Sequence, residues 1–69
     1  MKVGAIFKGP DGRRYEVLGP GEKPGTVCTR ALWGFGREDD RVGADMTEAN
    51  GWRVESKGTG GNVRGVERT

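Results

Sequence analysis

Glycine is the residue that most limits what this chain can fold into. Fourteen of the 69 residues are glycine, and they are spread along the whole chain without a repeating period. Glycine inside a helix costs about 1 kcal/mol relative to alanine, so long helices are disfavoured. Glycine also adopts the left-handed backbone conformations that tight turns require. The glycine content therefore predicts an all-β domain of short strands joined by turns.

The chain has room for one domain with a small core. Apolar and charged residues each make up 32% of it, and a short chain buries a lower fraction of its surface than a long one. Its one cysteine, Cys28, excludes an internal disulfide, whereas small extracellular domains usually carry several. No apolar run is typical of a signal peptide or long enough to span a membrane. These features predict a cytoplasmic protein that does not interact with membranes.

Alternation of apolar and polar residues predicts five strands, and one short helical turn precedes the last of them. The expected strands cover residues 2–8, 13–18, 26–35, 41–45 and 52–56, and the helical turn lies near residues 46–50. The run Gly9-Pro10-Asp11-Gly12 is typical of a tight turn, so the first two strands are expected to form a hairpin. Asp45 and Glu48 have the spacing of a capping box, which favours the helical turn.

The order of these elements resembles that of the small SH3-like β-barrels. The features that carry the resemblance are the turn at 9–12, the Pro- and Gly-rich loop at 19–25, and the short turn at 45–50 before Trp52-Arg53-Val54. It covers about residues 2–56 and implies a compact five-stranded barrel of a kind that often serves as a binding module. The motif of signalling SH3 domains is missing, so recognition of proline-rich peptides is not implied. An OB-like barrel is the nearest alternative, but it usually needs more residues.

The last thirteen residues differ in composition from the rest. Residues 1–56 are neutral overall, and the net charge of +2 lies in residues 57–69, which are rich in glycine. Such a composition predicts a disordered tail. The alternative is an extra edge strand, in which residues 62–67 pair with residues 52–57. We therefore expect a domain at 1–56 followed by a basic tail at 57–69.

The sequence lacks the residues that the common catalytic centres need. It has no histidine and one cysteine, which excludes Ser-His-Asp and Cys-His nucleophiles and most zinc sites. No phosphate-binding loop of the Gly-x-x-x-x-Gly-Lys-Ser/Thr type occurs. One acidic cluster is present, and we interpret it as a solvated loop that neighbouring arginines neutralise. We thus expect no enzyme activity, no cofactor and no bound metal. The cluster consists of Glu38, Asp39, Asp40 and Asp45.

The aromatic residues divide into core positions and candidate binding positions. Phe7 and Trp52 are assigned to the core, and Cys28 is interpreted as a small buried hydrophobe. Trp33 and Phe35 lie at the end of the predicted third strand, and packing in the core is the favoured interpretation for both. The alternative is that a bend exposes one ring beside an arginine, a combination common on recognition surfaces.

Arginines of the predicted strands form a second candidate surface. Arg14, Arg30 and Arg53 fall on one face of the sheet, opposite the bulky residues. Glu16 and Glu55 share that face, so cross-strand ion pairing is the simpler interpretation of the arginines. The residues that we single out for binding are Trp33, Phe35, Arg37, Arg14, Arg30 and Arg53.

Two functions are compatible with these observations. The first is a non-catalytic protein-binding module of the adaptor or inhibitor type, acting as a monomer or a homodimer. Such modules are frequent in compact genomes, those of phages among them. The second is a nucleic-acid-binding module that uses the basic sheet face and the basic tail. Strong nonspecific binding to duplex DNA takes several phosphate contacts, so the neutral body of the domain places a protein partner first and nucleic acid second.

Overall fold

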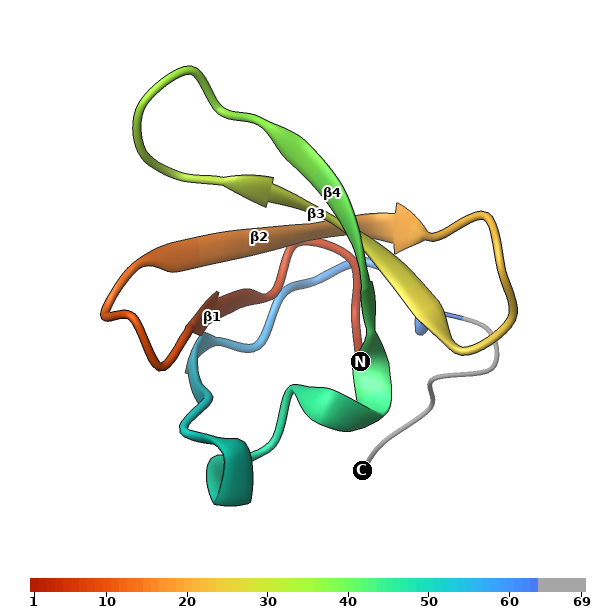
Figure 1. Cartoon of the computed structure of the whole chain (residues 1–69). Helices are drawn as coiled ribbons and strands as arrows, with labels where there is room; N and C mark the ends of the chain where they lie inside the picture. Colours follow the sequence, from red (N-terminus) through yellow and green to blue (C-terminus); the bar gives the residue numbers. More distant parts are fainter. Residues whose placement is uncertain (64–69) are drawn as a thin grey trace.

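The chain folds into a single five-stranded antiparallel sheet, seen in a computed structural model (Figure 1). The structure describes residues 1–63. Its strands and 3-10 helices are β1 (Ile6–Lys8), β2 (Arg14–Pro20), β3 (Thr26–Ala31), β4 (Glu38–Val42), η1 (Gly43–Asp45), η2 (Glu48–Asn50) and β5 (Arg53–Ser56). The all-β prediction is confirmed. The strand order is β4-β3-β2-β1-β5, and the described residues do not close the sheet into a barrel, because β4 and β5 do not pair.

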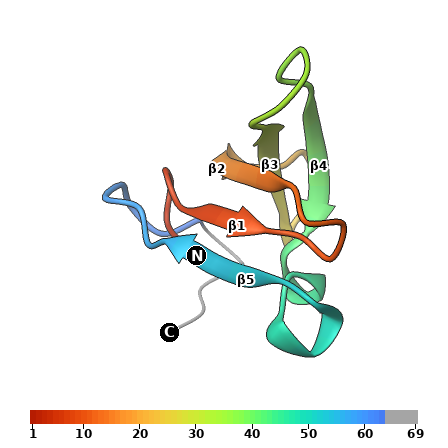
Figure 2. The ribbon, with the colours of Figure 1, turned by 90° about the vertical axis from the view of Figure 1, so that its left-hand side faces the viewer.

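Strands β1 to β4 follow one another as hairpins, and β5 returns to the free edge of β1. Phe7 lies opposite Tyr15 on one side and Val54 on the other. The predicted first hairpin is present, since the Gly9 N–H donates a hydrogen bond of 2.8 Å to the carbonyl oxygen of Arg13. Figure 2 shows β5 beside β1, with the two 3-10 helices linking β4 to β5 at one end of the sheet. None of the helices in residues 1–63 is long and apolar enough to cross a membrane.

The boundaries of the third and fourth strands differ from those expected. β3 ends at Ala31 instead of residue 35, and β4 begins at Glu38 instead of residue 41. Gly34 and Gly36 adopt φ values of 60° and 69°, which turn the chain out of the extended conformation. The acidic run that we interpreted as a loop is instead an edge strand, because the backbone of β3 pairs with it.

The expected helical turn is present as two separate 3-10 helices, and the expected capping box is absent. Asp45 is the last residue of η1, and Thr47 precedes η2 without a capping side-chain hydrogen bond. The Asn50 side chain instead ties the two together, since its Nδ2 donates to the backbone oxygen of Asp45 at 2.9 Å. η2 ends at Gly51, whose φ of 86° is left-handed.

The core lies on one face of the sheet, where alternate residues of each strand point inward. Val17, Val27 and Thr29 are almost completely buried there. Phe7 is buried as predicted, whereas Trp52 is half-buried and packs against the edge of the core. The buried apolar cluster consists of Met1, Ala5, Phe7, Val17, Val27, Met46 and Val63.

Residues 57–63 pack against the N-terminal end of the chain. The Val63 N–H donates to the carbonyl oxygen of Met1 at 2.7 Å, and the Val3 N–H donates to that of Gly61 at 3.0 Å. Val63 itself is 1% exposed, so this segment contributes to the core of the sheet domain. The rest of the sequence-predicted tail, residues 64–69, lies outside the described residues.

Candidate functional site

The connection between β3 and β4 places three large apolar side chains in solvent. We call residues 32–37 the hairpin tip. Leu32 is 43% exposed, Trp33 is 44% exposed, and Phe35 is fully exposed. The expectation that Trp33 and Phe35 pack in the core is therefore wrong, because the strand that would have carried them inward stops at Ala31. Figure 1 shows the tip projecting away from the rest of the sheet.

Beside the hairpin tip, arginine side chains lie on aromatic rings. The guanidinium carbon of Arg13 is 4.0 Å from the centre of the Trp33 ring. That of Arg41 is 4.4 Å from the Tyr15 ring and 5.5 Å from the Trp52 ring. The centres of the Tyr15 and Trp52 rings are 5.6 Å apart. We call these five residues the aromatic–arginine cluster, and it joins the exposed tip to the half-buried edge of the core.

Tyr15 connects the two halves of the cluster. Its hydroxyl donates a hydrogen bond of 2.8 Å to Oδ2 of Asp11, and the Arg13 N–H donates to Oδ1 of the same carboxylate at 2.9 Å. Burial raises the pKa of Tyr15, the hydrogen bond to Asp11 raises it further, and the neighbouring Arg41 and Trp33 oppose the increase. The Arg13 N–H and then the Tyr15 hydroxyl lower the pKa of Asp11. These contacts fix the turn that presents Arg13 to Trp33.

Half of the sequence-predicted binding residues lie elsewhere, on the outer face of the sheet. Arg14 forms an ion pair with Glu55, and Nη2 of Arg30 lies 2.8 Å from Oε1 of Glu16. Cross-strand ion pairing is thus confirmed for these two arginines. Arg14 lowers the pKa of Glu55, and Lys8 and Arg53 add to the effect. Of the six predicted residues, the structure places Trp33, Phe35 and Arg37 at the hairpin tip, and it places Arg14, Arg30 and Arg53 on strands β2, β3 and β5.

Cys28 is half-buried and is not among the core residues, so the interpretation as a small buried hydrophobe is wrong. Its Sγ is 3.9 Å from Oε1 of Glu38. Burial raises the pKa of the thiol, and the charges of Glu38 and Asp40 raise it further. A thiol with a raised pKa is a poor nucleophile because it stays protonated at neutral pH. Within residues 1–63, no group of three or more histidine, cysteine, aspartate or glutamate residues is placed to hold a metal ion.

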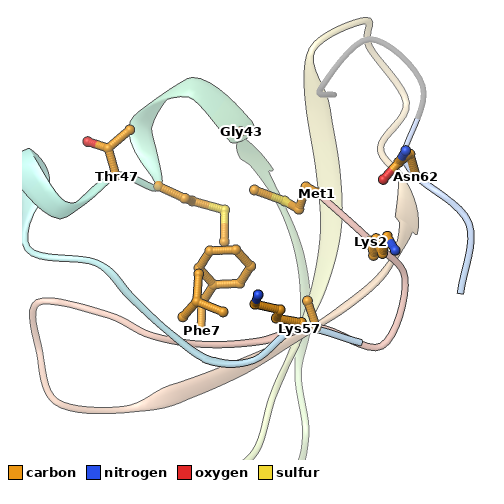
Figure 3. Close-up of a pocket in the computed structure, with 10 residues that line it drawn as sticks. Met1, Lys2, Phe7, Gly43, Thr47, Lys57 and Asn62 are labelled. Carbon is orange, nitrogen blue, oxygen red and sulfur yellow. The ribbon is translucent and has the colours of Figure 1, made fainter. Parts of the chain in front are cut away.

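A half-open cavity of about 610 Å³ lies on the side of the sheet that β4 and β5 leave unclosed. Its walls are largely apolar and include Phe7, Met46 and Val54. Figure 3 shows Met1 and Phe7 on facing sides of this cavity, with the amino group of Lys57 directed toward Phe7. Residues from both ends of the chain form it, so no local sequence pattern could reveal it.

Sequence reasoning found the hairpin tip but missed most of the aromatic–arginine cluster. Arg41 was assigned to neutralising the acidic run, whereas it pairs in register with the buried Val27 and points inward. No local pattern signalled this, because Asp39, the residue two positions before Arg41 on the strand, is exposed. Comparisons of the chain with protein-family models, with curated proteins and with solved structures found no match.

Proposed function

We propose that the protein is a non-catalytic binding module that holds a protein partner with its hairpin tip. The observation that carries the proposal is the full exposure of Phe35 next to the half-exposed Trp33. Burying a side chain such as phenylalanine stabilises a protein by about 1.5–3 kcal/mol. A domain with so few apolar residues forgoes that stabilisation when it leaves both rings in solvent. A partner that covers the tip would recover it.

The surroundings of the tip favour a protein partner. Interfaces between proteins are enriched in tryptophan and arginine at the positions that contribute most to affinity. The guanidinium of Arg13 lies over the Trp33 ring and restrains that ring before binding, which lowers the entropy lost on association. Arg37 and Asp39 form a solvent-exposed ion pair of 3.6 Å at the end of the tip, and they supply the polar rim that such interfaces have.

We extend the proposal to the architecture and place the domain with the small SH3-like barrels. The hairpin of β1 and β2 and the 3-10 helices before β5 support this assignment. The gap between β4 and β5 is where the domain departs from a closed barrel. A monomer and a homodimer are both compatible with the proposed function, and so is a cytoplasmic location.

Binding of single-stranded nucleic acid is the second candidate. It draws on the same tip, because nucleobases stack on aromatic rings and arginines contact phosphates. It ranks second because Arg14 and Arg30 of the basic sheet face are already paired with glutamates. Those pairs would have to break before either arginine could bind a phosphate.

Photo-crosslinking from the hairpin tip tests the proposal. A photoreactive phenylalanine analogue replaces Phe35, which its full exposure makes compatible with the fold. We expect a crosslinked species that protease degrades and nuclease does not. The matched control carries the analogue at Lys23, an exposed residue of the loop between β2 and β3. A nuclease-sensitive product would establish the nucleic-acid alternative, and equal products from both positions would refute binding at the tip.

A further inference from the structure

We propose that the half-open cavity binds a straight-chain carboxylate, with its hydrocarbon chain against the apolar walls and its carboxylate at the lysines of the rim. This inference does not depend on the proposed function. The cavity shares no residue with the hairpin tip or the aromatic–arginine cluster. Either site can therefore fail its test while the other one stands.

The walls of the cavity suit a flexible hydrocarbon chain. Phe7 and Met46 line the cavity and are 7% and 6% exposed, whereas Val54, which also lines it, is 50% exposed. Val54 is left open because no strand pairs with the outer edge of β5 among residues 1–63. Methionine side chains adapt to ligands of varying shape. The volume of about 610 Å³ lies within the range of about 300–1,000 Å³ that is usual for small-molecule sites.

The charges at the rim select an anionic head group. Lys2 and Lys57 both line the cavity, and none of the described residues that line it is acidic. Neither lysine forms an ion pair with another residue in the part of the chain that the structure describes. Asn62 and Thr47 add polar side chains that can complete the hydrogen bonding of a carboxylate. Figure 3 shows Lys2 beside Asn62, and Lys57 on the same cavity.

A single-chain carboxylate fits this arrangement better than a neutral or cationic amphiphile. A neutral chain would occupy the walls but gain no charge–charge attraction from the two ammonium groups. A cationic amphiphile would place a like charge beside Lys2 and Lys57, which opposes binding. A carboxylate accepts charge-assisted hydrogen bonds from lysine, and these are about twice as strong as neutral ones.

Titration of the whole chain with decanoate, followed by amide chemical shifts in NMR below the critical micelle concentration, tests the proposal. We expect saturable shifts at Phe7, Met46 and Val54. Each added methylene in the series from hexanoate to decanoate should tighten Kd about fourfold, as burial of a CH₂ group predicts. Decanol should bind about tenfold more weakly, and decyltrimethylammonium more weakly still. Equal affinity for all three head groups would overturn the choice of an anion, and the absence of saturable shifts would overturn the site.

Lysine variants test whether Lys2 and Lys57 bind the head group, independently of any general effect of removing lysines. The double variant Lys2→Ala/Lys57→Ala should weaken decanoate about tenfold and leave decanol unchanged. Lys8→Ala/Lys23→Ala removes two lysines that do not line the cavity and should change neither affinity. If the first variant binds decanoate as the control does, the lysines do not hold the head group. Sedimentation equilibrium completes the test, because a dimer found together with an absence of saturable shifts would replace the carboxylate by a second copy as the occupant of the cavity.

Discussion

Arg41 occupies a position where a hydrophobic residue would be expected. It lies opposite Val27 in the pairing of β3 with β4, and its Nε atom is buried with no hydrogen-bond partner among residues 1–63. Its guanidinium instead lies over the rings of Tyr15 and Trp52. The methylene stem of an arginine can cover apolar surface while its head group interacts with an aromatic face. Arg41 thus covers apolar surface at the open side of the sheet, where a further strand would otherwise pack.

Replacing Arg41 tests whether it stabilises the domain mainly through its stem or through its charge. Arg41→Ala removes both contributions and should lower the free energy of unfolding by about 1–3 kcal/mol. Arg41→Met keeps an unbranched apolar stem and removes the unpaired buried Nε, so it should cost less than the alanine variant. Urea denaturation followed by tryptophan fluorescence gives both values. A methionine variant as unstable as the alanine variant would show that the guanidinium–ring contacts dominate.

At the scale of elements, the sequence predicts the order of strands better than their ends. Apolar residues continue at alternate positions through Trp33 and Phe35, so the pattern extends the third strand past Ala31. The turn arises because Gly34 and Gly36 adopt left-handed conformations, and a glycine does not reveal from sequence alone whether it will do so. Local sequence patterns also do not reveal the whole candidate site. The pattern locates the hairpin tip, but the contact of Arg13 with Trp33 depends on how two separate hairpins pack together.

Substitutions at two glycines test how closely the segment after β5 packs against residues 3–5. Gly58 has a φ of 75°, and a Cβ atom added there would lie 2.7 Å from the carbonyl oxygen of Val3. Gly12 has a φ of 82° but no atom within 4 Å of such a Cβ. Gly12→Ala should therefore cost only the left-handed strain, about 1–2 kcal/mol. Gly58→Ala adds a backbone clash and should cost about 1–3 kcal/mol more. Thermal unfolding of both variants gives the difference, and equal losses would mean that the segment is not held against residues 3–5.

For the molecule as a whole, the two ends of the described chain complete the core. Strand pairing alone leaves one side of the sheet open, and Met1 and Val63 cover part of it at 8% and 1% exposure. Hydrogen bonds of 2.7–3.0 Å hold residues 60–63 beside residues 1–3. The composition of residues 57–69 predicted a tail, because glycine is abundant there and apolar residues are few. A single buried valine, Val63, nevertheless holds residues 57–63 against the core. Contacts between residues so far apart in the chain leave no local pattern in the sequence.

The contribution of this closure can be measured at Val63. Val63→Ala should lower the free energy of unfolding by about 2 kcal/mol, because it removes two buried methyl groups and leaves a cavity. The control Val42→Ala, at a position 48% exposed, should cost about 0.5 kcal/mol or less. A domain of this length is stable by roughly 3–10 kcal/mol.

A chain that ends at Ser56 loses the Val63 contact together with the hydrogen bonds to residues 1–3, and it should show no cooperative transition in calorimetry. A cooperative transition within a few degrees of the full chain would place the complete core within residues 1–56 and make the closing segment dispensable.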